Sequence, residues 1–271
     1  MKTLQLFIFC ITSFYFTQNI RFVYQVRMKT DSTQRDQVKS ELANLDIGKT
    51  NSVFYAAKAI LRDSIMDSNK KSQIGYISKE QFNMTASNIG YRIEKNYKKQ
   101  EVSYNAAIAK DIFIYTELKP FNWKITTETK KIGTYNTQKA QTQYAGRTWY
   151  AWFTTEVPFQ DGPYKFCGLP GLIVKAEDSK GDYLFELIET RKISDLYKAP
   201  TPWKQPIIVK KEEFLKVYKK VNADPIAFRP APPVSANGTS QRVDSDLNAD
   251  KKYRDEVNKR TNSFNNPIEF D

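Results

Sequence analysis

The stretch DGPYKFCGLPGLIVKAED, residues 161–178, decides the fold of this chain. It places the block Gly168–Ile173 between two strand-like runs, Tyr164–Phe166 and Leu172–Ala176. In the segment Leu169–Leu172 proline stands second and glycine third, which predicts a type II turn. The block is not a phosphate-binding loop, because it lacks the Gly-Lys-Ser/Thr ending and leads into a strand instead of a helix. We therefore expect a tight turn that positions a β-hairpin.

Strand-like segments extend on both sides of this stretch. Asp182–Arg191 follows as the expected hairpin partner, and Arg147–Thr155 precedes it as the most strongly strand-like segment of the chain. Further strands are expected at Asn19–Lys29, Glu41–Ile47, Ser52–Ala57, Tyr91–Tyr97, Glu101–Asn105, Lys110–Leu118, Asn122–Thr127 and Thr137–Tyr144. Strands this close together leave no room for parallel crossovers. We predict a mainly β fold: an antiparallel meander sheet, strongly curved or partly closed, with a few peripheral helices.

Helical and irregular segments surround the predicted sheet. Ala57–Asp67 fits one or two helical turns, and Lys211–Val221 has the apolar face of an amphipathic helix. Residues 229–240 read as a Pro-, Ala- and Ser-rich loop, and residues 244–261 as a charged, solvated helix. We expect three parts: a signal peptide at 1–18, a β domain at 19–193 that contains the block, and a C-terminal extension at 194–271, packed on that domain or trailing from it.

The amino terminus has the pattern of a signal peptide. Lys2 supplies the positive charge, and Leu4–Phe16 is apolar but shorter than the ~20 residues that a membrane span needs. Cleavage is expected near residues 16–19, and an uncleaved anchor is the alternative. The pattern predicts an exported protein that is periplasmic, outer-membrane-associated or secreted, with no transmembrane segment after cleavage.

Composition excludes several classes of function. The chain has no histidine, which rules out an imidazole-dependent triad and a His-bearing zinc site. The net charge of +12 comes from scattered lysine pairs, so we expect no nucleic-acid partner. Cys167 is the one cysteine left after signal cleavage and is expected to be a buried structural thiol. We expect neither a cofactor nor a metal.

With these residues the chain resembles the GLPGLI family of uncharacterised exported proteins, found chiefly in Bacteroidetes. Gly168–Ile173 is the block that names the family, and Gly162–Phe166 precedes it as in relatives. Gly146–Thr154 is similar to the family's GR…AW(F/Y)T strand, and Asn266–Glu269 is similar to its ending. Thr137 stands where relatives often carry cysteine. The resemblance implies export to the cell envelope and no established activity.

Two hypotheses of function follow from these patterns. The first is non-catalytic binding of an apolar ligand, a lipid or an outer-membrane or envelope protein at the surface around the block. Its expected lining residues are Arg147, Trp152, Tyr164, Lys165 and Phe166, while Gly168, Leu169, Pro170, Gly171, Leu172 and Ile173 are the structural motif. The alternative is a carboxylate-dependent envelope hydrolase that uses a pair of acids. Its candidate acids are Glu156, Asp161, Glu177 and Asp178.

Overall fold

The computed structural model describes residues 18–72, 77–109, 111–118, 121–200, 204–224, 251, 255 and 265–269. In these residues the fold is one sheet of twelve strands with three helices. The strands are β1 (Asn19–Met28), β2 (Lys39–Ile47), β3 (Asn51–Ala56), β4 (Tyr91–Asn96), β5 (Glu101–Ile108), β6 (Asp111–Leu118), β7 (Lys124–Ile132), β8 (Tyr135–Tyr144), β9 (Arg147–Thr154), β10 (Leu172–Asp178), β11 (Tyr183–Ile193) and β12 (Ile207–Ile208). The helices are α1 (Lys58–Lys71), α2 (Lys79–Thr85) and α3 (Lys211–Ala223).

Some expectations fall on other parts of the chain. The signal peptide up to residue 17, the loop 229–240 and all of 244–261 except residues 251 and 255 lie outside the described residues. Within the part that is described, no helix is long and apolar enough to cross a membrane.

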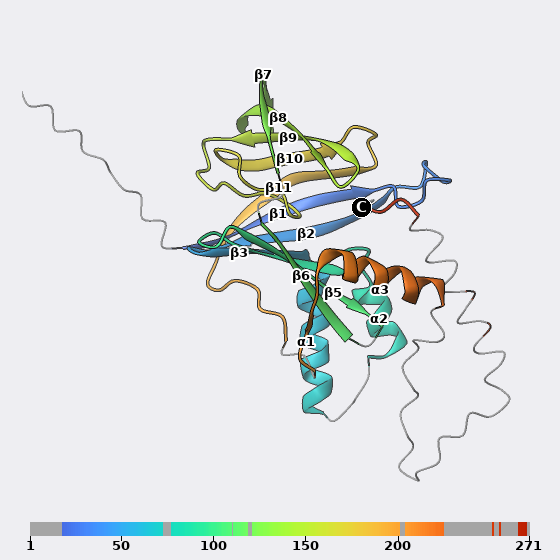
Figure 1. Ribbon diagram of the computed structural model, residues 1–271. Helices are drawn as coiled ribbons and strands as arrows, with labels where there is room; N and C mark the ends of the chain where they lie inside the picture. Colours follow the sequence, from blue (N-terminus) through green and yellow to red (C-terminus); the bar gives the residue numbers. More distant parts are fainter. Residues whose placement is uncertain are drawn as a thin grey trace, which may run out of the picture.

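The sheet consists of two halves that meet at β1. The strand order is β12-β6-β5-β4-β3-β2-β1-β11-β10-β9-β8-β7. All neighbours are antiparallel except β12, which runs parallel to β6. Figure 1 shows β1 in the middle, the half β2–β6 with the helices below it and the half β7–β11 above it. The predicted mainly β fold with an antiparallel meander is therefore confirmed.

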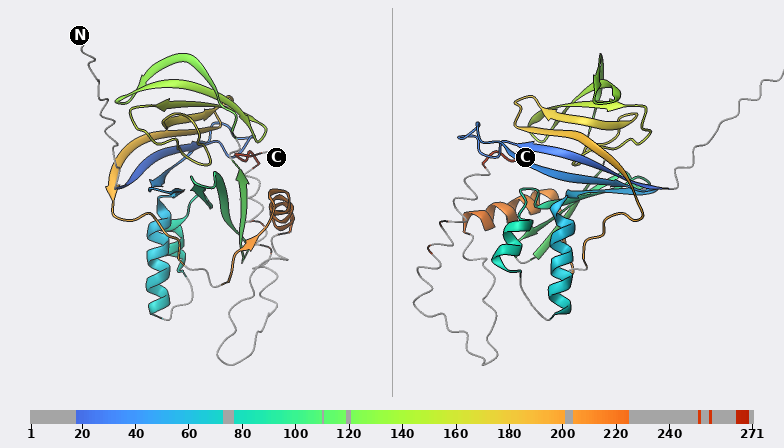
Figure 2. Two further views of the ribbon diagram at one scale, coloured as in Figure 1. Left: turned by 60° about the vertical axis from the view of Figure 1, so that its left-hand side comes forward. Right: turned by 180° about the vertical axis from the view of Figure 1, so that it is seen from behind.

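The predicted strong curvature or partial closure is wrong. The sheet is open, and β7 and β12 are its two edges. The reason lies in the connection between β9 and β10, whose side chains bind both halves of the sheet. Lys165 of this connection pairs with Glu117 of β6, and the ring of Phe166 lies 4.7 Å from that of Trp149 of β9. This connection lies on one face of the twisted sheet (Figure 2). Its side chains contact both halves, while the edge strands β7 and β12 are not paired with each other.

Alternation along the strands builds the core. Phe22, Tyr24 and Val26 of β1 are buried, as the alternating pattern of that segment predicts. Tyr24 also donates a hydrogen bond to the carbonyl of Ile173, 2.7 Å away, which fixes β10 against the centre of the sheet. Helix α3 forms as expected from its amphipathic pattern, and its Phe214 packs against β5 and β6.

The block Gly168–Ile173 forms a different turn from the predicted type II. The N–H of Gly171 donates to the carbonyl of Leu169 at 2.8 Å, while the N–H of Leu172 donates to Val157 at 3.1 Å. The φ of Gly171 is 159°, an almost fully extended conformation. The long-range bond to Val157 takes the donor that a local type II turn would use, so tertiary pairing decides the conformation here.

Candidate functional site

Residues 155–171 connect β9 to β10 and fold back on themselves; we call them the β9–β10 loop. Asp161 and Cys167 form a bridge within it, and the N–H of Gly168 donates to the carbonyl of Gln160 at 3.0 Å. Tyr164 has a φ of 53°, in the left-handed region that residues with a side chain seldom adopt. The loop therefore has a defined, internally bonded shape that places its charged side chains inside the protein.

The first of these charges is Asp161, which forms a buried ion pair with Lys95 of β4. Lys95 Nζ lies 2.5 Å from Asp161 Oδ1, and the two side chains are 3% and 1% exposed. The same Nζ donates to the carbonyls of Gly162 at 2.6 Å and Phe166 at 3.1 Å. Tyr97 donates to Asp161 Oδ2 at 2.7 Å. Burial, and then the charge of Asp161, raise the pKa of Tyr97 above its ordinary value, so Tyr97 stays a donor.

The second charge is Lys165, which is fully buried between two carboxylates. Its Nζ lies 2.5 Å from Glu117 of β6 and 2.5 Å from Glu269 near the chain's end. It also donates to the hydroxyls of Tyr115 at 2.8 Å and Tyr144 at 2.9 Å. A lysine is buried at low cost only when its charge and its donors are satisfied, and here they are. Lys165 therefore joins β6, β8 and the C-terminal residues.

Glu269 is held as a carboxylate by this arrangement. Burial alone raises its pKa, but the charges of Lys165 and Lys211 outweigh burial, and the pKa of Glu269 lies below its ordinary value of 4.5. Lys211 of α3 lies 3.1 Å from Glu269 and 3.5 Å from Glu117. The two lysines and two carboxylates balance, so the cluster has no net charge to offer a ligand.

Arg147 forms a third buried network. Its guanidinium lies 2.8 Å from Asp178 and 3.1 Å from Asp182, and it donates to the side-chain oxygen of Asn266 at 2.6 Å. It also donates to the carbonyl of Pro267 at 2.7 Å. The guanidinium has five N–H donors in one plane, which is enough for these four acceptor residues. Arg147 thus ties β9 to β10 and to the C-terminal residues.

The aromatic candidates lie on different faces. Phe166 and Tyr164 are fully buried, with their ring centroids 5.7 Å apart. Trp152 lies on the other side of β9, where the ammonium of Lys130 sits 3.9 Å from its ring centroid. The five residues expected to line a binding surface are all buried, and none of them lines the pocket described below. Arg147, Tyr164 and Lys165 contact residues 266–269, whereas Trp152 lies apart from them.

The candidate acids of the hydrolase hypothesis are also separated. Asp161 is bound to Lys95, and Asp178 is bound to Arg147. Glu177 lies 2.9 Å from Lys175, and Glu156 accepts from both nitrogens of Asn136 at 2.9 Å. Each acid has a partner of its own.

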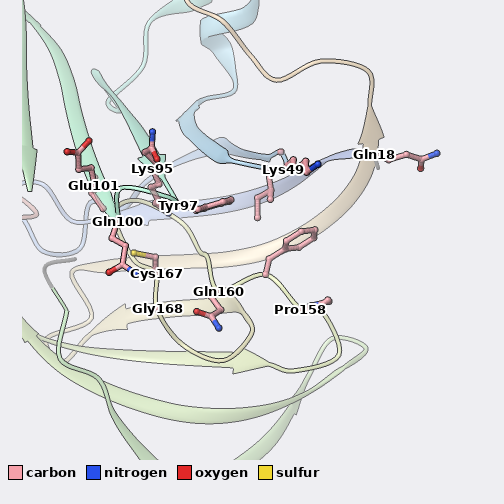
Figure 3. Close-up of a pocket in the computed structure, with 15 residues that line it drawn as sticks. Gln18, Lys49, Lys95, Tyr97, Gln100, Glu101, Pro158, Gln160, Cys167 and Gly168 are labelled. Carbon is pink, nitrogen blue, oxygen red and sulfur yellow. The ribbon is translucent and has the colours of Figure 1, made fainter. Parts of the chain in front are cut away.

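A pocket of about 400 Å³ lies beside the β9–β10 loop (Figure 3). It is formed where the β2–β3 turn, the β4–β5 turn and two parts of the loop meet. Its lining consists of Gln18, Ile47, Gly48, Lys49, Lys95, Asn96, Tyr97, Gln100, Glu101, Val102, Pro158, Phe159, Gln160, Cys167 and Gly168. The volume falls in the range of about 300–1,000 Å³ that small-molecule sites occupy.

The walls of this pocket are mainly apolar. Ile47 and Val102 are buried core residues, and the half-buried ring of Phe159 packs edge-on against Phe22 with centroids 6.1 Å apart. Cys167 is half-buried: it packs against the hydrophobic core and also lines the pocket, so the expectation of a buried structural thiol is confirmed only in part.

Sequence reasoning missed the other lining residues for a physical reason. Apart from Gln18, which precedes β1, they come from three connections that are far apart in the sequence, and only the strand pairing of the two halves brings them together. One local signal was present: Pro158-Phe159-Gln160 places a large aromatic residue in a polar connection. Among the described residues, no group of three or more acidic or cysteine side chains is arranged to hold a metal ion.

Comparisons with known proteins give the fold and a local family match. No curated protein matches the chain. Two solved structures of PNGF-II, in the P21 and C2 space groups, are similar with TM-scores of 0.55 and 0.52 at 18% and 19% identity. Each match covers 76% of this chain, which spans 34% and 33% of the solved chains, about a third of their length. At this identity the likeness concerns the fold alone. Residues 143–175, from the end of β8 through the block, match a family described as "Protein of unknown function (Porph_ging)".

Proposed function

We propose that this protein binds a small, uncharged ligand without catalysis, in the pocket beside the β9–β10 loop. The observation that carries the proposal is the pocket itself, about 400 Å³ in volume and walled by Ile47, Val102, Phe159 and the ring of Tyr97. Well-formed apolar pockets with a few polar groups are the usual sites for small molecules. The pocket also lies next to the block around which we expected function, but Gly168 is the one residue of the block and its expected lining that it uses.

The charges around the pocket favour an uncharged ligand. At its inner side Lys95 and Asp161 neutralise each other, and Asp161 is further bonded to Tyr97. At the rim Lys49 and Glu101 have opposite charges. The remaining polar lining includes the exposed amides of Gln100 and Gln160, which both donate and accept hydrogen bonds. An apolar body with hydroxyl or amide groups at one end is complementary to this lining.

The location that we propose is the cell envelope. The support is the signal-peptide pattern of the amino terminus and the resemblance of residues 162–173 to the GLPGLI family. An exported binding protein can pass its ligand to an envelope or outer-membrane partner, and we include such a partner in the proposal. The alternative of a carboxylate-dependent hydrolase has less support, because Asp161 and Asp178 are both neutralised by buried cations.

Phe159→Ala is expected to weaken binding at the pocket. The probes are N-phenylnaphthylamine, a neutral apolar dye, and anilinonaphthalene sulfonate, its anionic relative. Titration followed by fluorescence should give a dissociation constant for the neutral dye at least about tenfold higher in the variant, because covering an aromatic side chain contributes roughly 1.5–3 kcal/mol. The anionic dye should bind more weakly than the neutral one to the unaltered chain.

The matched control is Phe82→Ala, which removes a 54% exposed ring on α2 outside the pocket. Its dye affinity should equal that of the unaltered chain, and thermal unfolding should verify that both variants fold. Native mass spectrometry of the protein from the envelope fraction then identifies what it carries. Equal affinity of both variants for the neutral dye would refute the pocket assignment.

A further inference from the structure

Residues 265–269 contact the rest of the protein in the way that a bound peptide ligand would. Residues 265–269 lie beyond α3 and beyond residues 225–264, and their contacts reach the residues that follow β1, the strands β8, β9 and β11, helix α3 and the β9–β10 loop. Figure 1 shows this short segment next to β1 and β2, while α3 lies on the half with the helices. The segment is therefore attached to the protein mainly by side-chain recognition.

Asn266 is recognised through each of its polar groups. Its backbone N–H donates to the carbonyl of Thr30 at 2.9 Å, and its side-chain nitrogen donates to the carbonyl of Lys29 at 2.7 Å. Its side-chain oxygen accepts from Arg147 at 2.6 Å, and its carbonyl accepts from Tyr183 at 2.7 Å. Asn266 is 4% exposed. An aspartate here would lose the donor to Lys29, and an alanine would leave several buried groups without partners.

Glu269 is the second anchor. One carboxylate oxygen accepts from Tyr144 at 2.9 Å and from Tyr164, and it lies 2.5 Å from Lys165. The other oxygen lies 3.1 Å from Lys211. Such charge-assisted bonds are roughly twice as strong as neutral ones. The two anchors, Asn266 and Glu269, are three residues apart, and this spacing defines the peptide sequence that the site recognises.

The residues between the anchors fit an extended peptide. The carbonyl of Pro267 accepts from Arg147, and proline restricts the backbone before binding. The half-buried Ile268 packs against the hydrophobic core. The four residues thus present an amide, a rigid carbonyl, an apolar side chain and a carboxylate to complementary groups.

We propose that this site is a sequence-specific peptide-binding site for Asn-Pro-Ile-Glu, occupied here by the chain's own end. The residues that form it are Tyr144, Arg147, Tyr164, Lys165, Tyr183 and Lys211, with the carbonyls of Lys29 and Thr30. The covalent connection keeps the segment at high effective concentration. Cutting that connection turns the segment into an exchangeable peptide. The inference is independent of the ligand pocket.

The experiment uses the full chain with a specific protease site inserted between Asn237 and Gly238. After folding and cutting, a fluorescent peptide of residues 262–271 is added, and its anisotropy is measured. We expect the labelled peptide to replace the cut fragment and to be displaced by the unlabelled peptide. Competitors with Asn266→Ala or Glu269→Gln should be at least about tenfold weaker, since each loses buried charge-assisted bonds.

The matched control is a competitor with Asn265→Ala. Asn265 is exposed, and it accepts from the N–H of Ser32 at 2.7 Å and donates to Asp31 at 3.0 Å, both at the surface. It should compete within about threefold of the unaltered peptide. Equal competition by all four peptides, or no entry of the labelled peptide, would overturn the proposal. If cutting unfolds the chain, excess unlabelled peptide must preserve the fold, and failure to do so also overturns it.

The pH dependence of peptide affinity gives a second test of the same site. The groups that face Glu269 are Lys165, Lys211, Glu117 and the hydroxyls of Tyr115, Tyr144 and Tyr164. The pKa of Glu269 in the bound segment lies below its ordinary value of 4.5. The contribution of Glu269 to binding is therefore complete above pH 4.5 and is lost as the pH falls through the lowered pKa. The unaltered peptide should lose more affinity between pH 7 and about pH 3 than the Glu269→Gln peptide. The same loss for both peptides would contradict the role of Glu269.

Discussion

Lys95→Met is expected to lower the free energy of unfolding by about 3–5 kcal/mol, the cost of leaving a buried charge without its partner. Asp161 is 1% exposed, and its carboxylate lies 2.5 Å from the lysine. The carbonyls of Gly162 and Phe166 lose a donor at the same time. Denaturant unfolding followed by circular dichroism measures the change. Because this ion pair joins β4 to the β9–β10 loop, the loss should affect the whole fold.

Two controls separate the buried charge from other effects of the substitution. Lys99→Met removes a lysine from the same hairpin that is 66% exposed and 3.9 Å from Glu101, and it should cost less than about 1 kcal/mol. Adding Asp161→Asn to Lys95→Met removes the uncompensated carboxylate and should recover part of the lost stability. A Lys95→Met chain as stable as Lys99→Met would show that the ion pair does not hold the loop.

Gly171→Ala is expected to destabilise the fold by at least about 3 kcal/mol, at the upper end of what overpacking costs. A Cβ at this position would lie 2.0 Å from the carbonyl oxygen of Thr154 and 2.6 Å from its carbon. Both atoms are backbone, so no side chain can rotate away. The block needs glycine here because the end of β9 passes against it, and denaturant unfolding measures the cost.

Gly90→Ala is the matched control for this substitution. A Cβ at Gly90 meets nothing within 4 Å, so the change should leave the stability within about 0.5 kcal/mol of the unaltered chain. If Gly171→Ala unfolds at the same denaturant concentration as Gly90→Ala, close approach of the backbone is not the reason for glycine in the block.

The strands were predictable from sequence because their signal is local. Alternating residues in Arg147–Thr155 predict β9, and the apolar face of Lys211–Val221 predicts α3. The central position of β1 was not predictable, because its pairing with β11 joins segments that are far apart in the sequence. The open form of the sheet was missed for a similar reason, since it depends on where the side chains of the β9–β10 loop find partners.

The candidate site was harder to predict because its charged side chains are buried, whereas charged side chains usually lie at the surface. Arg147 and Lys165 looked like ligand contacts, since charged residues are seldom fully buried. Both are buried, because carboxylates distant in sequence neutralise them. The pocket residues Tyr97 and Phe159 gave no joint signal, since they belong to separate turns.

The pocket is tested most directly by the reactivity of Cys167, which lines it. The measurement is the rate of alkylation by iodoacetamide in a chain whose Cys10 is replaced by serine, with and without saturating N-phenylnaphthylamine. The bound dye should slow alkylation of Cys167 at least about tenfold, because ligands in such pockets are largely enclosed. The control places the thiol at exposed Ser179 in a chain that also carries Cys167→Ser, and its rate should not change. An unchanged rate at Cys167 while the dye is bound would contradict the proposed binding pocket.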